Sequence, residues 1–90
     1  MNSLEQELVE MICEVCKVEG GVPADFSPTA PLIGPESRLG IDSLDAVEIV
    51  FTVQNRYRVR IDSEETSRQV LASLKTLADF VEKNRPETAA

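Results

Sequence analysis

The distribution of proline and glycine sets the strongest limit on how this chain can fold. All four glycines and four of the five prolines lie within residues 20–41. Proline blocks the interior of a helix and glycine weakens regular elements, so we expect one long loop there. Apolar side chains inside the segment are expected to anchor this loop across the rest of the molecule. These side chains are Val22, Phe26, Leu32, Ile33, Leu39 and Ile41.

The segment before the loop has the apolar spacing of an amphipathic helix, which we expect over residues 4–18. Ser3 and Gln6 fit an S-x-x-Q capping box at its start. Cys13 and Cys16 form a C-x-x-C pair, a pattern that also occurs in redox and zinc sites. Because the pair lies inside a helix and the chain has no other cysteine and no histidine, we expect two reduced thiols, with Cys16 nearer the core.

Two shorter helices are expected in the last third of the chain. Residues 58–61 alternate polar and apolar like a strand, but no partner strand is evident, so we expect an extended connection. A third helix is expected over residues 63–71, with Asp62 giving a cap-like start. Ser73 can cap the fourth helix, and residues 86–90 are expected to be a disordered tail.

Bulk composition points to one small helical domain, which we place in residues 1–85. A chain of 90 residues buries only a modest core, and aromatic residues make up 4% of it. We therefore expect an all-α fold, a small four-helix bundle with a long first loop and a short third helix. No segment has the length and apolarity of a membrane span or a signal peptide, so we expect a cytoplasmic monomer.

The charge and the missing histidine exclude several function classes. The formal net charge of −7 argues against nucleic acid as a partner, because phosphates require a basic surface. It favours partners with basic docking surfaces. Without histidine, the chain cannot form Ser-His or Cys-His catalytic pairs and lacks the commonest metal ligand. We therefore expect a protein that is not an enzyme and that binds no metal.

Asp42 and Ser43 are both able to cap the helix that follows the loop, and residue types alone favour Ser43 as the cap. If Asp42 caps instead, Ser43 takes the first helical position. Its hydroxyl is then not needed by the backbone and points into solvent. A phosphate attached there would be stabilised by the positive end of the helix.

The same helix carries apolar residues on two sides. One side supplies enough residues for a core, whereas Leu44, Val47 and Phe51 form a separate stripe. Asp45 and Glu48 flank this stripe with negative charge. An apolar patch with a charged rim indicates a partner surface, unless a neighbouring helix covers it.

The run LGIDSLD, followed by this amphipathic helix, resembles the phosphopantetheine attachment region of acyl carrier proteins. The flanking helices and the long loop extend the resemblance over most of the chain. It implies that a phosphopantetheinyl transferase uses coenzyme A to attach phosphopantetheine to Ser43, and that Asp42 helps the transferase to organise magnesium. The thiol of the group would carry acyl intermediates between an acyl-loading enzyme, a ketosynthase and other enzymes of fatty-acid, polyketide or aryl-polyene-type synthesis.

The resemblance also implies that the helix after the serine is the partner-binding surface, formed by Leu44, Asp45, Val47, Glu48 and Phe51. The chain departs from fatty-acid carriers beyond that point, where those proteins have further glutamates. Here Arg56, Arg58 and Arg60 follow instead. We therefore include Arg56 among the partner-binding residues and expect a freestanding carrier of a specialised pathway.

Two alternatives remain open at this stage. The first is an unmodified adaptor with the same fold, which binds partners through the stripe of Leu44, Val47 and Phe51. The second is a peptidyl carrier. It is less favoured because Ile41-Asp42 precedes the serine, where peptidyl carriers tend to have Gly-Gly-His or Gly-Gly-Asp.

Overall fold

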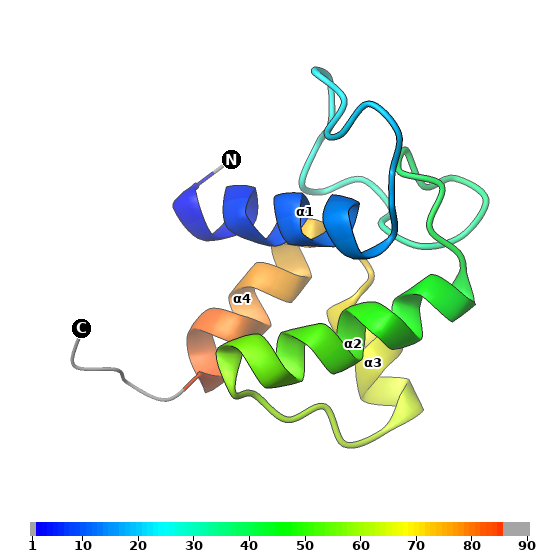
Figure 1. Cartoon of the computed structure of the whole chain (residues 1–90). Helices are drawn as coiled ribbons and strands as arrows, with labels where there is room; N and C mark the ends of the chain where they lie inside the picture. The colour runs from blue at the N-terminus through cyan, green and yellow to red at the C-terminus, as the bar shows by residue number, and fades with distance from the viewer. Residues whose placement is uncertain (1, 86–90) are drawn as a thin grey trace.

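The computed structural model describes residues 2–85, and these residues form four helices and no strand (Figure 1). The expected all-α, four-helix fold is confirmed. The tail expected at 86–90 lies outside the described residues. The helices are α1 (Ser3–Val15), α2 (Ser43–Tyr57), α3 (Glu64–Val70) and α4 (Leu74–Asn84).

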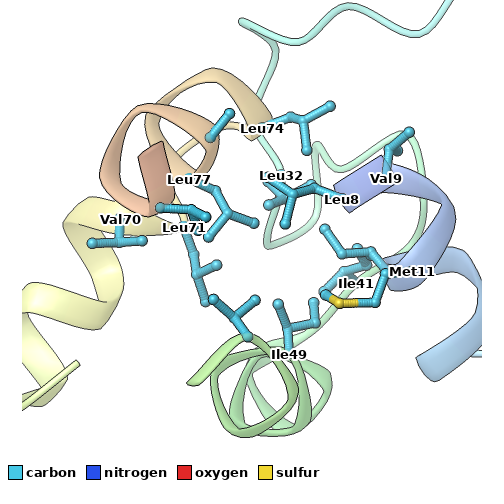
Figure 2. Packing of buried hydrophobic residues seen from close by; sticks show 14 of the residues in the cluster. Leu8, Val9, Met11, Leu32, Ile41, Ile49, Val70, Leu71, Leu74 and Leu77 are labelled. Carbon is cyan, nitrogen blue, oxygen red and sulfur yellow. The ribbon is translucent and has the colours of Figure 1, made fainter. Parts of the chain in front are cut away.

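A single hydrophobic core joins all four helices and the long loop. Helix α4 packs against α1 and α3, and α1 also packs against α2. Figure 2 shows side chains from α1, α2, α4 and the loop pointing toward one centre. Eleven large side chains in this core are less than 2% exposed. They are Leu8, Val9, Ile12, Leu32, Ile41, Ile49, Val53, Leu71, Leu74, Leu77 and Val81.

Backbone hydrogen bonds fasten the long loop to the start of α4. The amide of Leu32 donates to the carbonyl of Ala72 at 3.2 Å, and the amide of Lys75 donates to the carbonyl of Pro28 at 2.8 Å. The apolar anchors expected in the loop are confirmed. Four of them are buried, namely Phe26, Leu32, Leu39 and Ile41. The other two, Val22 and Ile33, are half-buried against the core.

Helix α1 begins one residue earlier than expected, and its capping box uses different residues. Asn2 is the cap: its Oδ1 accepts from the amide of Glu5 at 2.8 Å, and Glu5 Oε1 accepts from the amide of Asn2 at 2.9 Å. The expected box on Ser3 and Gln6 is therefore wrong. Asparagine caps as well as serine does, so residue type could not choose between neighbouring positions.

Helix α1 also ends at Val15, before the expected residue 18, and this explains the positions of the two cysteines. Lys17 adopts a left-handed conformation (φ 53°), and the amide of Val18 donates to the carbonyl of Cys13 at 2.9 Å, which closes the helix. Cys13 is buried on the core face, whereas Cys16 is a half-buried cap residue. The expectation that Cys16 lies nearer the core is wrong. Both thiols are free, as expected.

Helix α3 is held to the bundle by its C-terminal end. Val70 and Leu71 are buried, while the preceding residues are polar and mostly exposed. The cap is Ser63, whose Oγ accepts from the amide of Thr66 at 3.1 Å. The expected start at Asp62 is therefore displaced by one residue. The helix is shorter than the expected 63–71 span at both ends.

The connection between α2 and α3 is extended, as the sequence predicts. Val59 and Ile61 are buried in the core, and the amide of Ile61 donates to Gln54 Oε1 at 2.8 Å. Ser73 caps α4 as expected, accepting from the amide of Thr76 at 3.2 Å. These two contacts fix both ends of the α3 region.

One side-chain hydrogen bond links the end of α2 to α1. Tyr57 is buried, and its hydroxyl donates to Glu7 Oε1 at 2.7 Å. Burial, followed by this hydrogen bond, raises the pKa of the Tyr57 hydroxyl well above its ordinary value. The folded state therefore keeps this hydroxyl protonated at pH values where the unfolded chain loses the proton.

Tyr57→Phe is expected to lower the free energy of unfolding at pH 7 by about 1 kcal/mol, because the hydrogen bond to Glu7 is lost. The raised pKa makes this contribution complete below the unfolded value of about 10, and it declines as the pH rises toward the folded value. The gap between wild type and variant should therefore narrow at about pH 11. Urea titrations at pH 7 and about pH 11 measure the difference in free energy of unfolding between wild type and variant. An equal difference at both pH values would contradict a raised pKa for Tyr57 in the folded state.

Candidate functional site

The start of α2 is fixed by two aspartates. Asp42 Oδ1 accepts from the amide of Asp45 at 2.9 Å, and Asp45 Oδ2 accepts from the amide of Asp42 at 3.4 Å. Asp42 is therefore the cap and Ser43 is the first helical residue. The preference for Ser43 as the cap, drawn from residue types alone, is wrong. The second option considered for this helix is the one that forms.

The loop presents Ser43 at the surface. Ile41, two residues before it, is 1% exposed and holds the chain against the core. Gly40 takes a left-handed conformation (φ 68°) that favours glycine, and Ser37 Oγ accepts from the amides of Leu39 and Ile41. Ser43 itself is exposed. The backbone on both sides of the serine is thus held, while the serine hydroxyl is accessible.

Asp42→Ala is expected to lower the free energy of unfolding by about 1 kcal/mol, because the amide of Asp45 loses its acceptor. Asp42→Asn should lose only a few tenths of a kcal/mol, since asparagine caps equally well. Thermal unfolding of both variants measures the difference. Equal losses for the alanine and asparagine variants would show that the charge of Asp42, and not its capping bond, stabilises this end.

A pocket of about 360 Å³ opens beside Ser43, between α2, α3 and the loop. Its walls combine apolar side chains with serines and one pair of opposite charges. The lining residues are Ile33, Ser43, Ala46, Val47, Glu64, Ser67, Arg68, Leu71 and Ala72. A group attached to the Ser43 hydroxyl would start at the edge of this pocket, so the site has room for a substituent that is neither purely polar nor purely apolar.

The start of α2 carries several carboxylates, and their negative charge acts on Cys16 at the end of α1. Burial, followed by the carboxylates of Asp45 and Glu48, raises the pKa of the Cys16 thiol to about 11. Burial also raises the pKa of Cys13. A raised pKa disfavours the thiolate, the reactive form of cysteine. Both cysteines of the C-x-x-C pair therefore favour the protonated thiol.

The apolar stripe expected on α2 is confirmed. Leu44, Val47 and Phe51 are 78%, 66% and 65% exposed, and no neighbouring helix within residues 2–85 covers them. A surface hollow lies along the stripe, lined by Val47, Glu48, Phe51 and Thr52. The core side of α2 is equally clear, with Ile49, Val53 and Tyr57 buried. Helix α2 therefore has one face buried in the core and one exposed apolar face.

The predicted site residues do not all lie together. Asp42 through Phe51 occupy the first part of α2, around Ser43 and the apolar stripe. Arg56 is exposed in the last turn, which at 1.5 Å per residue places it roughly 20 Å along the helix from Ser43. Any partner that contacts both ends must therefore cover most of the length of α2.

The residues at and just after α3 that line the pocket were not predicted from the sequence. Glu64, Ser67, Arg68 and Leu71 line it, and their spacing places them on one side of a helix. That spacing was the available signal. The polar character of α3 obscured it, because polar residues at the start of a short helix are usually only solvated.

Two structural absences concern the part of the chain that the structure describes. No group of three or more His, Cys, Asp or Glu side chains is arranged to hold a metal ion within residues 2–85. None of the four described helices is long and apolar enough to cross a membrane.

Comparison with known proteins places the chain in a family. The family model "Phosphopantetheine attachment site" matches residues 6–82. Acyl carrier protein 3, chloroplastic, of Hordeum vulgare is 35% identical over 83 residues, covering 90% of this chain and 58% of the relative. Acyl carrier protein 1, chloroplastic, of the same plant is 35% identical over 86 residues, covering 96% of this chain and 55% of the relative.

A bacterial relative matches over nearly its whole length. The meromycolate extension acyl carrier protein of Mycolicibacterium aurum is 31% identical over 97 aligned positions, covering 100% of this chain and 92% of the relative. The chain spans only about half the length of the chloroplast relatives. No solved structure matches the chain significantly. The chain belongs to the acyl carrier protein family, whose members are not enzymes and carry a covalently attached phosphopantetheine group.

Proposed function

We propose that Ser43 is the attachment point for phosphopantetheine and that the protein carries acyl groups between the enzymes of a synthetic pathway. The observation that carries this proposal is that Asp42, and not Ser43, is the N-cap of α2. Asp42 accepts the hydrogen bond from the amide of Asp45 at the helix end, so the exposed Ser43 hydroxyl is available for a covalent bond. The pocket beside Ser43 gives the attached group room.

Ser43 is the acceptor in the loading reaction, which a phosphopantetheinyl transferase catalyses. Its Oγ attacks the phosphorus nearer to pantetheine in coenzyme A and forms the new O–P bond. The pyrophosphate bond breaks, adenosine 3′,5′-bisphosphate leaves, and the hydroxyl proton passes to the transferase or solvent. Asp42 caps through Oδ1, so Oδ2 is the oxygen that would bind the magnesium ion of the transferase. Once bound, the group supplies a thiol that holds acyl chains as thioesters.

The partner surface that we propose is the exposed face of α2. Leu44, Val47 and Phe51 provide its apolar centre, and Asp45 and Glu48 provide a negative rim. A fitting enzyme surface has an apolar hollow surrounded by lysine or arginine. The transferase, an acyl-loading enzyme and a ketosynthase are the proposed partners.

Incubation with coenzyme A, magnesium and a broad-specificity transferase tests the attachment. Intact-mass measurement should show one phosphopantetheine per chain, and fragmentation of the modified peptide should place it on Ser43. An unmodified mass after the same incubation that converts a known carrier would remove the proposal. It would support the alternative of an adaptor that binds partners through the α2 stripe without modification.

We further propose that the carrier serves a specialised pathway and not general fatty-acid synthesis. Three exposed arginines lie at and after the end of α2, namely Arg56, Arg58 and Arg60. Their positive charge would repel a basic partner surface. Docking to a general fatty-acid ketosynthase is therefore expected to be weaker than docking by a housekeeping carrier. Arg56→Glu should strengthen it, and added salt should reduce the difference. Titration at low and moderate salt measures the affinities, and matched values for both carriers would rule out the specialised assignment.

A further inference from the structure

The pocket beside Ser43 places one positive side chain opposite the serine. Ser43 lines it from α2 and Arg68 lines it from α3. Arg68 is the only lysine or arginine among the lining residues, all of which belong to the described part of the chain. A phosphodiester on the Ser43 oxygen would therefore form at the edge of a pocket whose single cation is a guanidinium.

Apart from the positive end of α2, the residues next to Ser43 in the sequence give such a phosphodiester no positively charged side chain. Asp42 and Asp45 flank the serine in sequence, and Glu48 lies one turn further along α2. The phosphodiester adds another negative charge to this acidic end. Arginine is the side chain best suited to phosphate, because its planar fork donates two parallel hydrogen bonds.

The present partner of Arg68 is easily exchanged. Arg68 Nη2 lies 3.2 Å from Glu64 Oε1, one turn earlier on α3, and the two side chains are 79% and 84% exposed. An exposed pair at this helical spacing contributes little to stability. A phosphodiester on Ser43 would be held covalently at the same pocket, so it can compete with Glu64 for the Arg68 guanidinium.

We propose that Arg68 binds the phosphodiester of the arm on Ser43, releasing Glu64, and that this contact ties α3 to α2 once the protein is modified. The inference rests on the proposed attachment at Ser43. Helix α3 is otherwise held mainly through Val70 and Leu71 at its C-terminal end. Its N-terminal half thus becomes more ordered in the modified protein, and partners that contact α3 can distinguish modified from unmodified carrier.

The test compares wild type, Arg68→Gln and Arg60→Gln, each unmodified and modified, without acyl cargo. Arg60 is a matched control: it is an exposed arginine with a carboxylate partner, Asp62 Oδ1 at 3.8 Å, and it does not line the pocket. At low salt, modification should slow amide hydrogen exchange in α3 by about threefold in wild type and Arg60→Gln, and not in Arg68→Gln. The slowing should disappear at about 1 M salt, where the screening length is about 3 Å.

The phosphorus NMR signal of the modified proteins gives an independent readout. Arg68→Gln should shift this signal relative to wild type, whereas Arg60→Gln should leave it in place. Identical signals in wild type and Arg68→Gln, or slower exchange in both, would overturn the assignment. A response that arises only after loading an acidic acyl group would also overturn it, by assigning Arg68 to the cargo. Intact mass separates the two proposals, because an absent adduct defeats attachment itself, and an adduct without these responses defeats only the role of Arg68.

Discussion

Ser43→Ala is expected to receive no phosphopantetheine under conditions in which the wild-type chain is fully converted. Alanine has no oxygen to attack the phosphorus of coenzyme A, whereas Asp42 keeps its capping bond to Asp45. The variant should therefore fold with a free energy of unfolding within about 0.5 kcal/mol of wild type. Intact mass after incubation with the transferase and urea titration measure the two quantities separately.

Ser67→Ala is the matched control for this experiment. Ser67 is another serine whose side chain lines the same pocket, and it lies on α3. Its replacement should leave conversion complete, because its hydroxyl is not proposed as an acceptor. Conversion of Ser43→Ala, or loss of conversion in Ser67→Ala alone, would assign the acceptor to a residue other than Ser43.

Leu77→Ala is expected to lower the free energy of unfolding by about 2–5 kcal/mol. Leu77 is fully buried on α4, at the centre of the core in Figure 2. Its truncation removes apolar contact and leaves a cavity that the surrounding helices fill only in part. A domain of this size has a total stability of about 5–15 kcal/mol, so the change takes a large share of it.

Leu44→Ala provides the matched control, because the substitution is the same but Leu44 is 78% exposed. Its effect on the free energy of unfolding should stay within about 0.5 kcal/mol. Urea unfolding followed by far-ultraviolet circular dichroism measures both variants. A large loss for Leu44→Ala would mean that the stripe on α2 is part of the folded core, which would contradict its proposed role as a partner surface.

The elements of this fold follow from local signals, whereas their first residues do not. The loop over 20–41 and the helices around it were predictable because proline, glycine and apolar spacing act within one segment. The caps were harder to predict. Asn2 lies beside Ser3, and Asp62 beside Ser63, and all four residues are of types that cap helices well. Their local preferences differ by only a few tenths of a kcal/mol, so the packing of the helix in the bundle decides which residue becomes the cap.

The pocket and its α3 wall could not be predicted for a different reason. Ser43 and Arg68 face one pocket because of how α2 and α3 pack in the bundle, which the spacing of residues on one segment does not determine. The bond between Tyr57 and Glu7 joins residues 50 positions apart and has the same origin. The residues around Ser43 in the sequence predict its place at the start of a helix. They do not predict that Arg68 lines the same pocket.

The backbone bonds between the long loop and the start of α4 join segments that the ribosome makes at different times. Pro28 and Leu32 pair with Lys75 and Ala72, so these bonds to the loop form only after the ribosome has made the start of α4. Small domains fold as units once their chain is available. The loop that leads to Ser43 is therefore fastened only after residues 72–75 have been made, later than the serine itself.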